Sequence, residues 1–167
     1  ITAAIADATP WSAAPHDRAM ILNAIANAYE ANAPELFAIL AREAGKGLPD
    51  AVAELREAVD FLRYYAAQID QAATARGVWT CISPWNFPLA IFSGQIAAAL
   101  AAGNAVLAKP AEQTPIIATR TVMLMHAAGV PCDVLQLLPG DGAVGAALTG
   151  DARICGVAFT GSTTTAL

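Results

Sequence analysis

Four polar segments that could do chemistry each follow a short apolar run in the second half of the chain. They are 83–88 (SPWNFP), 109–112 (KPAE), 139–142 (PGDG) and 160–163 (TGST). In parallel sheets covered by helices, ligands bind at the carboxyl ends of the strands. If the apolar runs are parallel strands, all four segments lie along one edge of one sheet. The sequence therefore favours a ligand site at that edge.

Asn86 is the residue of the first segment with the clearest chemical use. It stands between aromatic residues and prolines in a rigid turn. Its amide can donate a hydrogen bond to a developing oxyanion, and such a donor is worth about 2.7–4 kcal/mol. The alternative is an asparagine that closes the turn through its own backbone, which turn statistics make about as frequent.

Lys109 and Glu112 are spaced to reach one ligand from the end of a strand. The ammonium group can donate to a hydroxyl or phosphate, and the carboxylate can accept from a ribose hydroxyl. The alternative is a solvated ion pair worth roughly 0–1 kcal/mol. Lys109 ends an uncharged run from Gly77 to Ala108, which favours a functional role.

The last segment places backbone N–H groups and hydroxyls where a helix should begin. Phosphate is favoured at such a position, although a glycine turn with a serine cap would give the same sequence. No G-x-G-x-x-G follows the first predicted strand, so the ordinary dinucleotide fingerprint is absent.

The cysteines and histidines carry no comparable signal. Cys81, Cys132 and Cys155 have no metal-binding spacing and no adjacent base, so each reads as a small buried hydrophobe rather than a nucleophile. His16 and His126 fall on predicted helices away from the strand ends. We therefore predict no metal site and a reduced, cytoplasmic setting.

The elements that must position these segments follow from the spacing of apolar residues. The first part of the chain predicts three helices that begin near Pro15, Pro34 and Pro49, since proline is favoured in a first helical turn. The third is the longest, and we expect an Arg56–Asp60 ion pair on its polar side. Its predicted apolar stripe is Val52, Leu55, Val59, Leu62, Tyr65 and Ile69.

The second part of the chain alternates strands with helices. Strands are predicted at 77–83, 105–109, 134–138 and 156–160, and helices at 89–102, 115–128 and 144–148, with a further helix starting at 161. Thr114 is the expected N-cap of the middle helix. This alternation predicts an α/β fold, with N-terminal helices at 1–71 and a Rossmann-like parallel sheet with alternating helices at 77–167, in one structural domain overall.

Composition limits the partners. The formal net charge is -5 and no cluster of lysine and arginine occurs, which argues against nucleic acid. Residues Ile1 to Pro10 lack the basic region of a signal peptide. The uncharged run is interrupted by prolines and by Gly103-Asn104, so we predict no membrane span.

The motifs resemble those of aldehyde dehydrogenases. The blocks 81–89 (CISPWNFPL), 101–104 (AAGN), 109–115 (KPAEQTP) and 159–163 (FTGST) follow in the order of that family. The segments 42–46 (REAGK) and 57–65 (EAVDFLRYY) make the chain similar to the glutamate-semialdehyde (1-pyrroline-5-carboxylate) dehydrogenase domain of bacterial bifunctional proline-utilization proteins. The resemblance covers nearly the whole chain.

This resemblance implies an NAD site in a family that binds NAD without the usual glycine fingerprint. Asn86 is similar to the asparagine that stabilises the oxyanion, and Lys109 and Glu112 to the pair that holds the adenosine ribose. Gly161 and Ser162 are similar to the turn that meets the pyrophosphate. The full set implied in cofactor binding is Ile82, Ser83, Pro84, Trp85, Lys109, Glu112, Gly142, Thr160, Gly161 and Ser162.

The implied activity is oxidation of L-glutamate γ-semialdehyde to L-glutamate in proline catabolism. NAD and an aldehyde are the implied ligands, with FAD in a separate domain of a homo-oligomeric full-length protein. The family's general-base glutamate and thiol nucleophile lie downstream of 159–163, so we expect the chain alone to be inactive. Three features depart from the family: a short 68–77 stretch, Ala75-Arg76-Gly77 in place of a proline-containing entry, and Thr164 at a commonly acidic position.

Three alternatives remain open from the sequence. The chain could be a catalytically dead NAD-binding or protein-interaction module, or part of a dehydrogenase for another aldehyde. It could also be a folding intermediate whose unpaired sheet edge favours aggregation.

Overall fold

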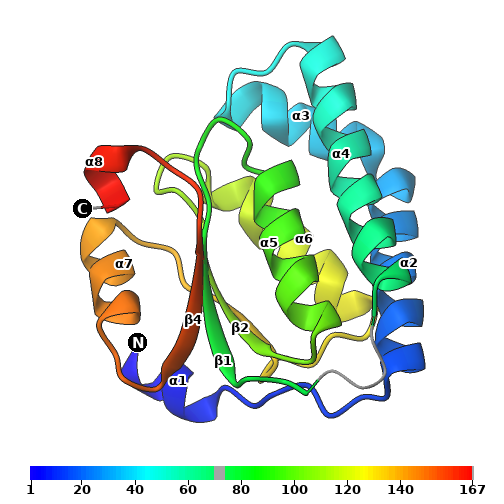
Figure 1. Ribbon diagram of the computed structural model, residues 1–167. Helices are drawn as coiled ribbons and strands as arrows, with labels where there is room; N and C mark the ends of the chain where they lie inside the picture. The colour runs from blue at the N-terminus through cyan, green and yellow to red at the C-terminus, as the bar shows by residue number, and fades with distance from the viewer. Residues whose placement is uncertain (70–73, 167) are drawn as a thin grey trace.

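The computed structural model describes residues 1–69 and 74–166, which form a sheet between two layers of helices (Figure 1). The strands are β1 (Val78–Ile82), β2 (Ala105–Lys109), β3 (Leu135–Leu137) and β4 (Ile154–Phe159). Their order is β3-β2-β1-β4, and each neighbouring pair is parallel. The predicted α/β class with a parallel sheet is confirmed, and each strand begins and ends within two residues of its predicted bounds.

Five helices cover one face of the sheet. They are α2 (Pro15–Ala31), α3 (Ala33–Glu43), α4 (Leu48–Ala67), α5 (Ala90–Ala101) and α6 (Pro115–Ala127). Figure 1 shows α5 and α6 beside the strands, with α2 and α4 outside them. Tyr29 of α2, Leu62 of α4, Leu100 of α5 and Ile117 of α6 are fully buried in one apolar cluster. The N-terminal helices and the sheet therefore share a core.

A smaller layer covers the other face. It consists of α1 (Thr2–Asp7) and α7 (Gly142–Thr149), which pack through Ile5 and Leu148 on Val78 and Leu107 of the strands. The sequence did not predict α1, because a six-residue helix with Ile5 as its buried residue has no periodic pattern to detect. A short helix, α8 (Thr163–Ala166), follows β4 as expected.

The buried stripe of α4 differs from the predicted one. Val52 is 36% exposed, Ile69 lies beyond the end of the helix, and Arg56 and Asp60 are exposed without forming an ion pair in the described structure. An exposed pair of this kind gains little free energy, so solvation of the two charges competes easily with pairing. The stripe instead consists of Ala51, Glu54, Leu55, Ala58, Val59, Leu62 and Ala66.

The predicted cap of α6 is also wrong in its chemistry. Thr114 occupies the N-cap position, but its side chain makes no capping bond and its hydroxyl is buried without a partner in the described structure. Glu43, at the end of α3, accepts hydrogen bonds from Ile116 N (2.6 Å) and Ile117 N (2.8 Å) instead. The carboxylate accepts the two N–H groups on separate oxygens, Oε1 and Oε2.

The predicted boundary of the helical part at residue 71 lies outside the described residues, and so do residues 70–73 of the unusually short 68–77 stretch. Within 1–69 and 74–166, no helix is long and apolar enough to cross a bilayer.

Candidate cofactor site

The carboxyl ends of three strands are level with one another. Ile82 of β1 pairs in register with Lys109 of β2 and with Phe159 of β4. The segments that follow these strands therefore leave the sheet at one edge, as the sequence predicted, and β3 adds the loop before α7. A cleft of about 540 Å³ opens there, within the roughly 300–1,000 Å³ of small-molecule sites.

Every residue that the sequence assigned to the site lines this cleft. The lining consists of Ile82, Ser83, Pro84, Trp85, Asn86, Lys109, Ala111, Glu112, Gln113, Gly142, Phe159, Thr160, Gly161, Ser162 and Thr165. Sequence reasoning missed Ala111, Gln113, Phe159 and Thr165, although the first three adjoin assigned residues. The structure thus brings the candidates together, while the role of each stays a prediction.

Lys109 is the buried cation of the cleft. Its side chain is nearly covered, at 6% exposure for the residue, and Nζ donates to the carbonyl oxygen of Pro110 at 2.9 Å. Burial lowers the pKa of Lys109, and the nearby charges of Glu112 and Asp141 oppose that shift. No Lys109–Glu112 ion pair forms in the described structure, so the alternative of a simple solvated pair is not found.

Asn86 lies exposed in the loop between β1 and α5. The described structure records no hydrogen bond from its side chain to its own turn, so the alternative of a turn-closing asparagine is not found either. The loop is fixed at both ends, by Ser83 N donating to Lys109 O at 3.3 Å and Ile91 N donating to Phe87 O at 3.3 Å. The backbone is therefore anchored on both sides of Asn86, and the residue lies in the lining of the cleft.

Ser83 offers an independent sign that the cleft takes a polar ligand. Its hydroxyl is buried, with the residue 4% exposed, and has no hydrogen-bond partner among the described residues. An unpaired buried hydroxyl is costly, and this one lies in the lining of the cleft. A polar ligand in the cleft would satisfy it.

The fourth segment is tied to the sheet by backbone and side-chain bonds. Thr160 N donates to Ile82 O at 3.0 Å, and Gln95 of α5 donates to Thr160 Oγ1 at 3.0 Å. A Cβ at Gly161 would lie 2.6 Å from the Phe159 ring, so a larger residue at this position would clash with the ring. Ser162 Oγ accepts from Thr165 N at 3.2 Å and caps α8.

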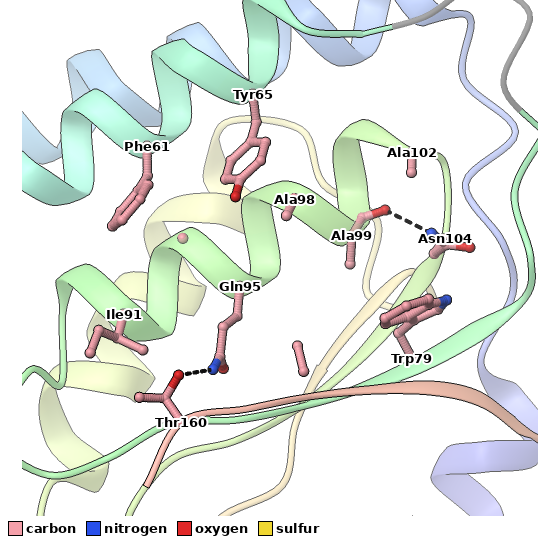
Figure 2. Close-up of a pocket in the computed structure, with 12 residues that line it drawn as sticks. Phe61, Tyr65, Trp79, Ile91, Gln95, Ala98, Ala99, Ala102, Asn104 and Thr160 are labelled. Carbon is pink, nitrogen blue, oxygen red and sulfur yellow. Dashed lines mark hydrogen bonds between the residues drawn. The ribbon is translucent and has the colours of Figure 1, made fainter.

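A second, largely apolar pocket of about 440 Å³ adjoins the cleft at Thr160. Figure 2 shows Phe61 and Tyr65 of α4 facing Ile91 and Gln95 of α5, with Trp79 of β1 at the far end. The dashed line from Gln95 to Thr160 marks the hydrogen bond between α5 and the residue that lines both spaces.

The cysteines do not contribute to the cleft. Cys81 is fully buried, and burial raises the pKa of its thiol to about 12. Cys132 and Cys155 are exposed, which corrects the prediction of small buried hydrophobes, and they lie at the amino ends of β3 and β4, opposite the cleft. The part of the chain that the structure describes holds no group of three metal-binding side chains.

Comparison with known proteins decides the family. The sequence profile of the aldehyde dehydrogenase family matches residues 1–167. This chain belongs to the aldehyde dehydrogenase family. The bifunctional protein PutA of Klebsiella aerogenes is 58% identical to this aldehyde dehydrogenase chain over 170 residues, covering 98% of the chain and 13% of PutA.

Solved structures agree with this assignment. A crystal structure of a Bradyrhizobium japonicum proline utilization A mutant matches with a TM-score of 0.92 and 47% identity, over 99% of this aldehyde dehydrogenase chain and 19% of that one. The 1-pyrroline-5-carboxylate dehydrogenase from Thermus with bound NAD matches with a TM-score of 0.80 and 35% identity, over 85% and 31%. The chain thus spans well under half the length of these relatives.

Proposed function

We propose that this chain is the cofactor-binding part of an NAD-dependent aldehyde dehydrogenase. Its substrate is L-glutamate γ-semialdehyde, the open form of 1-pyrroline-5-carboxylate, and its product is L-glutamate in proline catabolism. The observation that carries the proposal is the gathering of Asn86, Lys109 and Glu112 around one cleft at the carboxyl edge of the sheet. The similarity to PutA and to 1-pyrroline-5-carboxylate dehydrogenase supports the choice of aldehyde.

The residues of the cleft fit NAD. Lys109 and Glu112 would hold the adenosine ribose, the ammonium group as donor and the carboxylate as acceptor. Gly161 and Ser162 would meet the pyrophosphate, and Gly142 and residues 82–85 would line the rest of the site, where the unpaired Ser83 hydroxyl would add a polar partner. When bound, NAD supplies the acceptor for the hydride that leaves the substrate.

Asn86 acts on the aldehyde itself. A thiolate supplied by another part of the full-length protein adds to the aldehyde carbon, and the carbonyl oxygen becomes negatively charged. The Asn86 amide donates to this oxygen and lowers the barrier, as fixed donors do in oxyanion holes. The chain alone contributes binding and oxyanion stabilisation, and we propose that it does not turn over by itself.

Steady-state kinetics tests this proposal. The natural polypeptide that carries this sequence is assayed for NADH formation with 1-pyrroline-5-carboxylate and with a panel of unrelated aldehydes. The proposal expects turnover that is fastest with 1-pyrroline-5-carboxylate and absent without NAD. Faster turnover of another aldehyde would support the alternative substrate, and NAD binding without turnover would support a dead binding module.

Three further properties of the full-length protein belong to the same proposal. FAD is bound by a separate domain, the protein is a homo-oligomer, and it works in the cytoplasm, where the three free cysteines of this chain stay reduced. Flavin absorbance and the mass in solution test the first two.

A further inference from the structure

Glu54 of α4 is a buried carboxylate that contacts the segment between Asn86 and α5. The residue is 1% exposed, and its Oε1 accepts hydrogen bonds from Leu89 N at 2.8 Å and Ala90 N at 3.3 Å. These N–H groups belong to the start of α5, where Leu89 at the N-cap position provides no side-chain bond. The first N–H groups of a helix have no partner within it. Glu54 therefore supplies a cap from another helix.

Lys46 contacts both Glu54 and the same loop. Its Nζ lies 2.9 Å from Glu54 Oε2 as an ion pair, and 4.1 Å from the centroid of the Phe87 ring. A cation over an aromatic ring is attracted to it, more strongly where water is excluded. The Lys46 side chain is 14% exposed and that of Glu54 is fully buried, so the pair is shielded. Phe87 directly follows Asn86 in the chain.

Stability alone does not account for this pair. A buried ion pair is often no more stabilising than well-packed apolar residues of similar volume. Glu54 binds the backbone at 89–90, and Lys46 contacts the side chain of Phe87. These contacted residues lie within four positions of Asn86 in the chain. An oxyanion donor has to be held within about 0.5 Å of its working position.

We propose that Glu54, together with Lys46, is a positioning residue that sets the place of the Asn86 amide. This inference rests on the proposed function, because it concerns the use of Asn86 in aldehyde oxidation. Asn86 follows β1 and acts on the aldehyde oxygen, whereas Lys109 and Glu112 belong to the end of the neighbouring strand β2 and the loop after it and make no contact with Glu54 or Lys46 in the described structure. Loss of the Glu54–Lys46 pair therefore lowers kcat and leaves the affinity for NAD unchanged.

The test uses the natural polypeptide that carries this sequence, with Glu54→Gln and Lys46→Met. The readouts are kcat per folded molecule, the Kd for NAD, and hydrogen exchange of the Leu89 and Ala90 amides. We expect kcat to fall about tenfold to a hundredfold, since a misplacement of about 1 Å costs about a hundredfold. The Kd for NAD stays unchanged and exchange of the two amides speeds up. The control is Glu35→Gln, which breaks a half-exposed pair with Arg120 away from the loop and leaves all three readouts unchanged.

The outcomes separate the two claims. If the unaltered protein neither binds NAD nor oxidises an aldehyde, the proposed function fails before the variants are considered. If it does both, an unchanged kcat per folded molecule in both variants overturns the inference, and so does a matching loss of kcat and NAD affinity. Should one variant fail to fold, the double variant Lys46→Met/Glu54→Gln takes its place, because it leaves no unpaired buried charge. The same outcomes in kcat and in the Kd for NAD then support or overturn the inference.

Discussion

Glu43 Oε2 accepts a hydrogen bond of 2.8 Å from the Ile117 N–H, across 74 positions of sequence. This contact joins the end of α3 to the start of α6, the helix that follows Lys109 and Glu112. Together with Glu54 at the start of α5, it shows that carboxylates of the N-terminal helices cap α5 and α6, two of the helices that leave the carboxyl edge of the sheet. The N-terminal helices therefore fix the loops of the cleft as well as covering the sheet.

Loss of the α6 cap should destabilise the fold. Glu43→Ala removes the acceptor of two N–H groups, and a lost N-cap costs about 0.5–2 kcal/mol. Urea unfolding followed by circular dichroism measures the change. Thr114→Val is the matched control, because the Thr114 hydroxyl is buried and unpartnered in the described structure, so its removal is neutral or stabilising. A larger loss in Thr114→Val than in Glu43→Ala would show that the threonine is the cap after all.

Asn86→Ala should separate chemistry from binding. Removal of an oxyanion donor lowers kcat by about a hundredfold to a thousandfold, while the Kd for NAD stays the same, because Lys109 and Glu112 are intact. Steady-state kinetics and calorimetry on the natural polypeptide measure both. Asn23→Ala is the control, since Asn23 is exposed on α2 and its amide contacts Ala19 O of the same helix. Equal kcat values for the two variants would remove Asn86 from the chemistry.

A methyl group at Gly156 should strain the sheet. Gly156 pairs with Trp79 across β4 and β1, and an added Cβ would lie 2.6 Å from the indole ring. Overpacking of this kind typically costs about 1–3 kcal/mol, so Gly156→Ala lowers the thermal midpoint. At Gly142 an added Cβ meets no described atom within 4 Å, and Gly142→Ala serves as the stability control. A midpoint for Gly156→Ala equal to that of Gly142→Ala would contradict the tight Trp79 contact.

Cys81 should stay inert in the folded protein and affect stability at alkaline pH. Burial raises the pKa of its thiol from 9.0 to about 12, so the neutral form is favoured in the folded state. Its contribution to stability is fully present below about pH 9.0 and is lost as the pH rises toward about 12. The stability difference between the unaltered protein and Cys81→Ala therefore shrinks over that range. Alkylation at neutral pH should label Cys132 and Cys155 and spare Cys81, and early labelling of Cys81 would show that the sheet opens.

The strands and the edge that carries the site were predictable from the sequence because their signals are local. Apolar runs such as 105–108 stand between Gly103-Asn104 and Lys109-Pro110, and each polar segment follows its strand directly. Once the strands are parallel, their carboxyl ends meet at one edge, which is all that the sequence predicted. The strand order and the register that pairs Ile82 with Lys109 and Phe159 depend on long-range contacts and come from the structure.

The caps were not predictable because they depend on contacts distant in sequence. A glutamate on a helix reads as exposed, and Glu54 is buried because its partners at Leu89 and Ala90 lie 35 and 36 positions away. Thr114 fits the local capping pattern, but packing of α3 against α6 brings Glu43 to the same N–H groups. The position of Val52 at the margin of its stripe also depends on how α4 is rotated against its neighbours, which the spacing of apolar residues fixes only approximately.

The central claim is that the cleft at the carboxyl ends of β1, β2 and β4 binds NAD. Calorimetric titration of the natural polypeptide with NAD tests it most directly. The test variant is Lys109→Ala, and the control is Arg63→Ala, which removes a cation that pairs with Glu30 on the outer helices. We predict that NAD binds saturably and that Lys109→Ala weakens the binding about tenfold to a hundredfold, because a hydrogen bond from a charged group is worth about 1.5–3 kcal/mol. Arg63→Ala should leave the affinity for NAD unchanged. Absence of saturable binding by the folded protein, or equal affinity in Lys109→Ala, would contradict the claim.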